Sequence, residues 1–109
     1  AAEVIFAVYS GELAGFALFF NNFSTFLGKA GLYLEDVFVR PQFRGKGVGV
    51  AIMKKLASIA KERGYGRVEW ICLDWNEPSI NFYKKLGAIP MDEWTIYRLT
   101  EEKFAMLAD

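Results

Sequence analysis

Glycine alternates with larger residues in one short segment that also carries two basic side chains, Arg44-Gly45-Lys46-Gly47-Val48-Gly49. Glycine lets the backbone come close to a ligand and adopt positive φ, so several N–H groups can converge on one anion. A helix-like run follows, and its first turn adds unpaired N–H groups and the positive end of the helix dipole. Because Arg44 and Lys46 also add mobile positive charge, the segment predicts a phosphate-binding loop.

The spacing of the glycines distinguishes between kinds of phosphate loop. A P-loop needs a hydroxyl residue directly after its lysine, whereas Gly47 follows Lys46 here. A dinucleotide loop needs the order G-x-G-x-x-G and an acidic residue about 20 positions on, and Glu69 falls inside the next predicted strand instead of at its end. The order R-x-x-G-x-G does fit, with Arg44, Gly47 and Gly49. Taken alone, the segment is equally consistent with a tight strand-to-helix turn that binds no ligand.

The R-x-x-G-x-G pattern resembles the acetyl-CoA pyrophosphate loop of the GNAT superfamily of N-acetyltransferases. Leu-Tyr-Leu-Glu-Asp-Val-Phe-Val at 32–39 precedes it, and Trp-Asn-Glu-Pro-Ser-Ile-Asn-Phe-Tyr-Lys at 75–84 follows its helix and one more strand. From about Ala14 to the C-terminus, the chain is similar to the diamine acetyltransferase branch, which includes the spermidine/spermine and thialysine N-acetyltransferases. The resemblance implies acetyl transfer from acetyl-CoA to an amine.

The resemblance also implies a fold. We expect one α+β domain over residues 1–109, with a GNAT-like mixed β-sheet flanked by helices. Members of the family carry a first strand and a helical pair before the region where this sequence starts. Ala1-Ala2-Glu3 leads directly into strand-like sequence without an initiator Met. We therefore expect an N-terminally truncated domain that lacks the first strand and the helical pair.

Acetyl-CoA contacts follow from the same resemblance. They comprise the end of a bulged strand, the loop with the helix start, and one asparagine: Val37, Phe38, Val39, Arg44, Gly45, Lys46, Gly47, Val48, Gly49, Val50 and Asn76. Asn76 precedes Tyr83 by seven residues. If the helix has already begun at Asn76, two turns place both side chains on one face, and otherwise Asn76 caps the helix.

Tyr83 is the candidate general acid. A thiol with a pKa of about 8.5 leaves as an anion that a phenol with a pKa of about 10 can protonate over a short distance. In the related enzymes the tyrosine at this place of the motif has that role. The alternative is a core tyrosine on the apolar stripe of Ile80, Tyr83 and Leu86.

Carboxylates are the candidates for binding the amine. Glu35 and Asp36 are adjacent on a predicted strand, so they face opposite sides of the sheet unless a bulge turns one of them. The resemblance implies such a bulge and assigns Glu35 to amine binding and water-mediated deprotonation, with Asp36 in support. Two solvated strand carboxylates are the alternative. Asp92 and Glu93 lie in a turn before Trp94, and they belong either to a solvated loop or to an acidic funnel for a polycation.

Composition excludes several functions. Thirteen basic and thirteen acidic residues give no net charge, so a nucleic-acid role is not expected. With no histidine, the usual general base and the commonest transition-metal ligand are missing, and we expect no metal. The longest apolar run, 14–20, is too short to span a membrane, and the single cysteine, Cys72, suits a cytoplasmic protein. Aromatic residues make up 17% of the chain, which together with the family resemblance predicts a homodimer.

Periodicity and turn residues predict the elements. Strands are expected at 4–9, 13–20, 32–39, 67–75 and 94–99, and helices at 48–63, from about 77 to Gly87, and after Thr100. Ser10-Gly11-Glu12 joins the first two strands, Asn21-Asn22 reads as a polar loop, and Gly64 ends the first helix.

The leading hypothesis is therefore an N-acetyltransferase for a small primary amine, such as a polyamine, a diamine or a thialysine-like compound. A non-catalytic acyl-CoA-binding module and an acetyltransferase of a protein amine are the alternatives. The presence of Glu35, Asn76 and Tyr83 together favours the enzyme.

Overall fold

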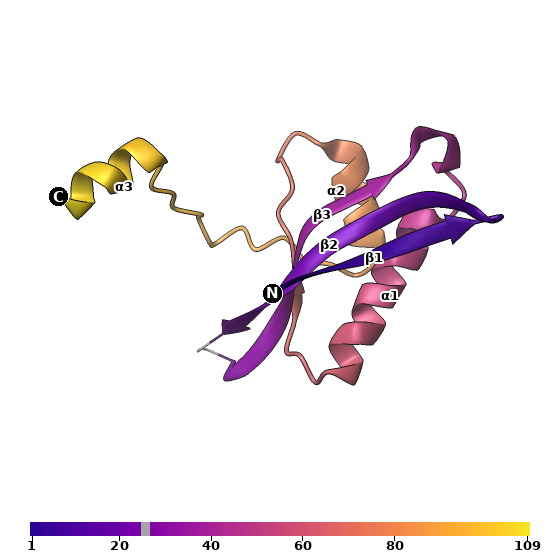
Figure 1. The fold of residues 1–109 in the computed structure, drawn as a ribbon, viewed down its shortest axis with the longest axis horizontal. Coiled ribbons are helices and arrows are strands. Elements are labelled where there is room, and N and C mark those ends of the chain that lie inside the picture. Colours follow the sequence, from indigo (N-terminus) through magenta and orange to yellow (C-terminus); the bar gives the residue numbers. More distant parts are fainter. Residues whose placement is uncertain (25–26) are drawn as a thin grey trace. The chain divides into compact units, whose positions relative to one another are not determined.

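The structure is a computed structural model that describes residues 1–24 and 27–109 (Figure 1). The chain divides into two compact units, Ala1–Ile71 and Cys72–Asp109, each of which is described by itself. No helix among the described residues is long and apolar enough to cross a membrane.

Unit 1 contains a mixed sheet with the strand order β1-β2-β3-β4. Its strands are β1 (Ala2–Tyr9), β2 (Glu12–Ser24), β3 (Lys29–Val39) and β4 (Val68–Glu69). β1, β2 and β3 are antiparallel, whereas β4 runs parallel to β3. The turn between β1 and β2 is Ser10-Gly11, and both residues have positive φ, 50° and 80°. Such a turn matches the twist of the flanking strands, which explains the predicted hairpin.

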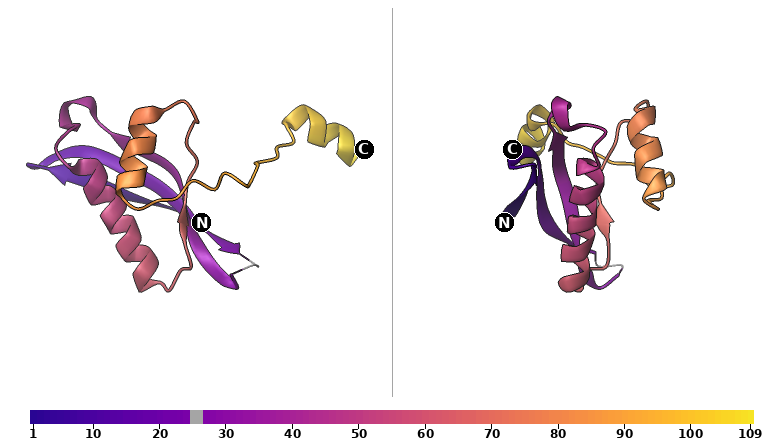
Figure 2. Two further views of the ribbon diagram at one scale, coloured as in Figure 1. Left: turned by 180° about the vertical axis from the view of Figure 1, so that it is seen from behind. Right: turned by 90° about the vertical axis from the view of Figure 1, so that its right-hand side faces the viewer.

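Helix α1 (Val48–Glu62) covers one face of this sheet (Figures 1 and 2). The core combines the buried side of the sheet with the apolar stripe of the helix: Ala14, Ala17, Phe19, Leu32, Leu34, Phe43, Val48, Ile52, Met53, Leu56 and Ala60. The apolar residues Val48, Ile52, Leu56 and Ala60 recur at three- and four-residue spacing in this helix and are buried, and Ile59 is half-buried. Gly64, with φ of 69°, follows the C-cap residue Arg63, as predicted from the sequence.

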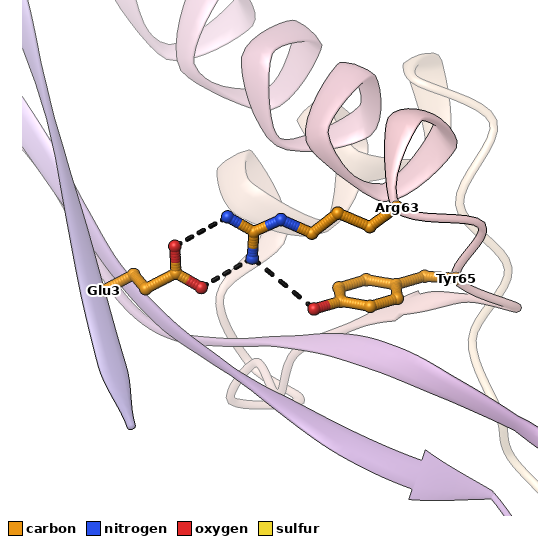
Figure 3. Close-up of polar contacts among 3 residues, drawn as sticks. All are labelled: Glu3, Arg63 and Tyr65. Atoms are coloured by element: carbon orange, nitrogen blue, oxygen red, sulfur yellow. Dashed lines mark hydrogen bonds and ion pairs between the residues drawn. The ribbon is translucent and has the colours of Figure 1, made fainter.

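An ion pair fastens the end of α1 to the edge strand (Figure 3). The Arg63 guanidinium donates to both carboxylate oxygens of Glu3, at 2.6 and 2.7 Å, and to the Tyr65 hydroxyl at 3.4 Å. The bond from Arg63 holds the pKa of Glu3 below its ordinary value. Because Glu3 bonds to Arg63, the residue that caps the end of α1, the side chain of Glu3 lies on the face of the sheet that α1 covers.

The register between β2 and β3 contains a bulge. Phe19 pairs with Leu34 and Leu18 pairs with Asp36, which leaves Glu35 as the additional residue on β3. This confirms the bulge that the family resemblance implies. A bulge places two residues of one strand opposite one residue of its neighbour and ends the regular alternation of faces.

Unit 2 contains two helices, α2 (Glu77–Lys85) and α3 (Glu101–Ala108). Pro78 lies in the first turn of α2, and Gly87 follows its end with φ of 95°. Thr100 is the N-cap residue of α3, and Glu101 and Glu102 lie in its first turn. These starts and ends agree with the predictions from the sequence.

Three predicted elements are wrong. Asn21 and Asn22 do not form a loop, because β2 continues through them and pairs them with Leu32 and Gly31. The strand predicted at 67–75 is limited to Val68–Glu69, the two residues that find a partner on β3. Residues 94–99 form no strand within the described residues, and their side chains are exposed. Strand propensity produces a strand only where a neighbouring strand accepts and donates the backbone hydrogen bonds.

Candidate functional site

The phosphate-loop candidate connects β3 to α1. A short 3₁₀-helix, Pro41–Phe43, follows β3, and the chain then turns through Gly45 and Gly47, whose φ angles are 76° and 81°. Gly47 is the N-cap residue of α1 and offers no side chain to the helix. Left-handed backbone is strained for residues with a Cβ atom, so both positions require glycine.

Backbone donors gather in this loop. Within the described residues, no backbone N–H from Gly45 to Val50 donates to an acceptor; the next N–H along, that of Ala51, binds the Gly47 carbonyl at 3.0 Å. Free N–H groups at a helix start, together with the positive end of the helix dipole, favour an anion. The loop therefore has the donors that a phosphate group requires.

Basic side chains surround the loop. Arg44 donates from Nε to the Val39 carbonyl at 3.2 Å, which leaves the two terminal nitrogens of its guanidinium without an acceptor in the described chain. The Lys46 ammonium lies 5.7 Å from the centre of the Tyr9 ring, and no described carboxylate forms an ion pair with it. These two positive charges are thus available to an anionic ligand.

The last part of β3 has one edge without a strand partner in the described residues. β3 pairs with β4 at Leu32 and Tyr33, and this ladder ends before the bulge at Glu35. Val37, Phe38 and Val39 pair with β2 through their other edge. The free edge leads directly into the loop, so an extended ligand that reaches the loop can also meet unpaired backbone groups of β3.

The bulge brings two carboxylates to one face. Phe19 and Leu34 lie on the α1 side, because Phe19 pairs with Glu3. Glu35 follows Leu34 directly and therefore lies on the opposite face, which is remote from α1. Asp36 lies on that same face, because it pairs with Leu18, which is also remote from α1. Both carboxylates are exposed.

Aromatic pairs lie across the same two strands on the face that carries these carboxylates. The rings of Phe16 and Phe38 are 6.0 Å apart between centroids, and those of Phe20 and Tyr33 are 5.5 Å apart. The register places Phe16 opposite Phe38 and Phe20 opposite Tyr33, on either side of the bulge. Two acids between aromatic surfaces form a suitable environment for an organic cation.

The remaining predicted residues lie in unit 2. Asn76 is outside α2 and caps it, because its side-chain oxygen accepts from the Ser79 N–H at 3.4 Å. Tyr83 lies on α2 and is half-buried, and burial, with a smaller contribution from Cys72, raises its pKa above the ordinary value of a tyrosine. The environment thus favours the protonated phenol, the form that a general acid requires. Asp92 is exposed and lies outside the helices.

The structure thus brings together the loop, the free edge of β3 and the pair Glu35 and Asp36, all within unit 1. The roles of these residues, like those of Asn76, Tyr83 and Asp92 in unit 2, stay predictions. Sequence reasoning missed Tyr9, whose ring lies beside Lys46. No motif marks this tyrosine. Its contact with Lys46 depends on the pairing of β1 with β2 and on the course of the short helix after β3, which local sequence patterns do not show.

Comparisons with known proteins show the family to which the sequence is related. The chain matches the model of the Acetyltransferase (GNAT) family over residues 1–88. It is 49% identical over 88 residues to an L-ornithine N5-acetyltransferase of Arabidopsis thaliana, and the matched region covers 81% of this chain and 39% of that protein. It is 38% identical over 99 residues to a thialysine N-epsilon-acetyltransferase of Mus musculus, and the matched region covers 88% of this chain and 58% of that protein.

A solved structure of similar fold is an integron cassette protein from the mobile metagenome of V. cholerae. The TM-score is 0.89 at 34% identity, over 98% of this chain and 66% of the other. This chain spans about two-fifths and three-fifths of the two curated relatives, respectively.

Proposed function

Because this chain belongs to the GNAT acetyltransferase family, we propose that the protein transfers an acetyl group from acetyl-CoA to the primary amine of a small molecule, such as a polyamine, a diamine or a thialysine-like compound. The observation that carries this proposal is the row of N–H groups from Gly45 to Val50, which follow Arg44, extend into the first turn of α1 and find no acceptor in the described residues. Unpaired N–H groups at a helix start favour an anion, and the pyrophosphate of acetyl-CoA is such a group.

The free edge of β3 extends the proposed acetyl-CoA site. Val37, Phe38 and Val39 border this edge next to the loop, and those of their backbone groups that point away from β2 can bind the amide groups of the pantetheine arm as a neighbouring strand would. Asn76 is proposed to contribute its amide nitrogen, because its oxygen caps α2.

The amine is proposed to bind at the bulge. Glu35 and Asp36 attract a cation, and the flanking aromatic rings add cation–π stabilisation of about 0.5–1 kcal/mol at an exposed site. A diamine suits this site better than a monoamine, since one ammonium can remain on the carboxylates while the other amine reacts. Glu35 is also the proposed route, through water, for the proton that the reacting amine loses. Asp92 is proposed to attract the distal charge of a longer polyamine.

Tyr83 is the proposed general acid. Acetyl-CoA supplies a thioester as the acetyl donor. When its C–S bond breaks and the new C–N bond forms, the phenol of Tyr83 donates its proton to the departing sulfur. Burial raises the pKa of Tyr83, which keeps this proton in place before the reaction.

A homodimer and a cytoplasmic location belong to the same proposal. Large apolar side chains are exposed on the sheet face remote from α1, among them Val4 and Phe6, and such surface favours a covering partner. Sedimentation of the full-length protein tests the dimer, and a monomer at high micromolar concentration would contradict it.

Titration calorimetry with acetyl-CoA, followed by an acceptor screen, tests the proposed function in the full-length protein. We expect acetyl-CoA to bind and at least one diamine, polyamine or thialysine-like amine to be acetylated. Binding without turnover on any small amine or protein amine would identify an acyl-CoA-binding module instead. Absence of binding would reject the proposal as a whole.

A further inference from the structure

Tyr9 contacts the phosphate-loop candidate from a distant part of the sequence. It is the last residue of β1, directly before the Ser10-Gly11 turn, and 39% of it is exposed. Its ring lies 5.7 Å from the buried ring of Phe43, between centroids, at an interplanar angle of 57°. The Lys46 ammonium lies 5.7 Å from the centre of the same ring.

The β1–β2 hairpin also holds the start of this loop by hydrogen bonds. The backbone N–H of Arg40 donates to the Ala14 carbonyl at 2.8 Å, and the Arg40 guanidinium donates to the Leu13 carbonyl at 2.7 Å. The guanidinium lies 5.6 Å from the centre of the Phe43 ring. Tyr9 therefore packs against Phe43 in a segment that hydrogen bonds hold to the hairpin, and its ring can restrict the flexible side chain of Lys46.

We propose that Tyr9 is a positioning residue that holds the Lys46 ammonium for contact with a phosphate group of acetyl-CoA. The inference rests on the proposed function. A free lysine side chain loses much rotamer freedom when it binds, and a ring that already restricts the ammonium reduces that loss. The cation–π contact also holds the ammonium without neutralising its charge, whereas a carboxylate partner would neutralise it. Tyr9 itself is not expected to touch the ligand.

The test measures the affinity of the full-length protein for acetyl-CoA by titration calorimetry. Tyr9→Leu keeps an apolar contact for Phe43 and removes the aromatic face, whereas the matched control Tyr9→Phe keeps the ring. We expect Tyr9→Phe to bind like the wild type and Tyr9→Leu to bind about two- to fivefold more weakly, the range of an exposed cation–π contact. Thermal unfolding checks that each variant is folded, and Tyr9→Thr, which suits a strand, replaces Tyr9→Leu if that variant does not fold.

Repeating the comparison in a Lys46→Ala background distinguishes positioning from a general effect on the loop. We expect Tyr9→Leu to have no further effect there, because the two residues act through one contact. An equal loss in both backgrounds, or no loss in the wild-type background, would overturn the inference. If Lys46→Ala weakens binding while Tyr9→Leu does not, the proposed function stands and this inference fails. A wild-type protein that does not bind acetyl-CoA would remove both.

Discussion

Gly47→Ala is expected to weaken acetyl-CoA binding by straining the loop. The glycine has φ of 81°, and a Cβ atom built at this position meets no other atom within 4 Å. The obstacle to alanine is therefore the backbone angle and not a collision inside the protein. A residue with a Cβ atom in left-handed backbone costs roughly 1–2 kcal/mol.

The size of the effect on affinity depends on whether the ligand-free or the ligand-bound protein carries this strain. Without ligand, a loop that carries alanine can relax to negative φ, which turns its N–H groups away from the anion site. Binding must then restore the original angle against the full strain. A cost of about 1–2 kcal/mol corresponds to an affinity roughly 5- to 30-fold lower. Gly47→Val should have a larger effect, because a β-branched residue tolerates positive φ less well.

Gly64→Ala is the matched control. Gly64 has φ of 69°, an added Cβ there also meets no atom within 4 Å, and it follows the other end of α1. Thermal unfolding of the ligand-free proteins checks that both variants are folded, and calorimetry should report weaker acetyl-CoA binding for Gly47→Ala alone. Equal affinities for the two variants would refute the role of the loop conformation.

Three further substitutions address the acid, the amine site and the ion pair. Tyr83→Phe should lower kcat about 100-fold or more while the affinity for acetyl-CoA stays near the wild-type value; near-normal turnover, with chemistry shown to limit the rate, would return Tyr83 to a packing role. Glu35→Gln should raise KM most for the acceptor with the most positive charges, because an amide lacks the electrostatic attraction of a carboxylate; an equal rise for all acceptors would contradict this. Arg63 lowers the pKa of Glu3, so this pair stabilises the fold above the ordinary pKa of a glutamate carboxyl group, and the stabilisation is lost as pH falls through the lower pKa of the folded state. Denaturation of Glu3→Gln between pH 3 and 7 should therefore show a weaker loss of stability in acid than the wild type, and identical pH profiles would exclude the pair as a source of that loss.

Local signals in the sequence were sufficient for much of the fold. Gly64 and Gly87 stop helices at positive φ, and the Ser10-Gly11 turn closes the predicted hairpin. The glycines of the loop and the Asn76 cap likewise follow from the conformations that single residues favour. Each of these features depends on a few neighbouring residues, which is why a sequence can predict them.

Features that depend on distant partners were harder to predict. Asn21 and Asn22 have turn-like side chains, yet β3 supplies a partner for each and β2 continues through them. Residues 94–99 are rich in strand formers, but no described strand pairs with them. The position of Tyr9 beside Lys46 likewise depends on contacts between β1 and a loop more than 30 residues away, and no local pattern marks such a contact.

The bulge at Glu35 links both parts of the proposed site. It directs two carboxylates to one face, and it lies where β3 loses its pairing with β4 and acquires a free edge. Deletion of Glu35 should leave Leu34 and Asp36 on their present faces, because their partners Phe19 and Leu18 are adjacent on β2. The fold should therefore tolerate the deletion, and thermal unfolding can verify this.

Deletion and Glu35→Gln then separate geometry from charge. Both remove the carboxylate, so both should weaken amine binding. The deletion also removes the local twist that a bulge imposes on a strand, and with it the course of Val37, Phe38 and Val39 toward the loop. If that course positions backbone groups for acetyl-CoA, calorimetry should find weaker acetyl-CoA binding after deletion and unchanged binding for Glu35→Gln. A folded deletion variant that binds acetyl-CoA as tightly as Glu35→Gln would show that the bulge serves only to place the carboxylate.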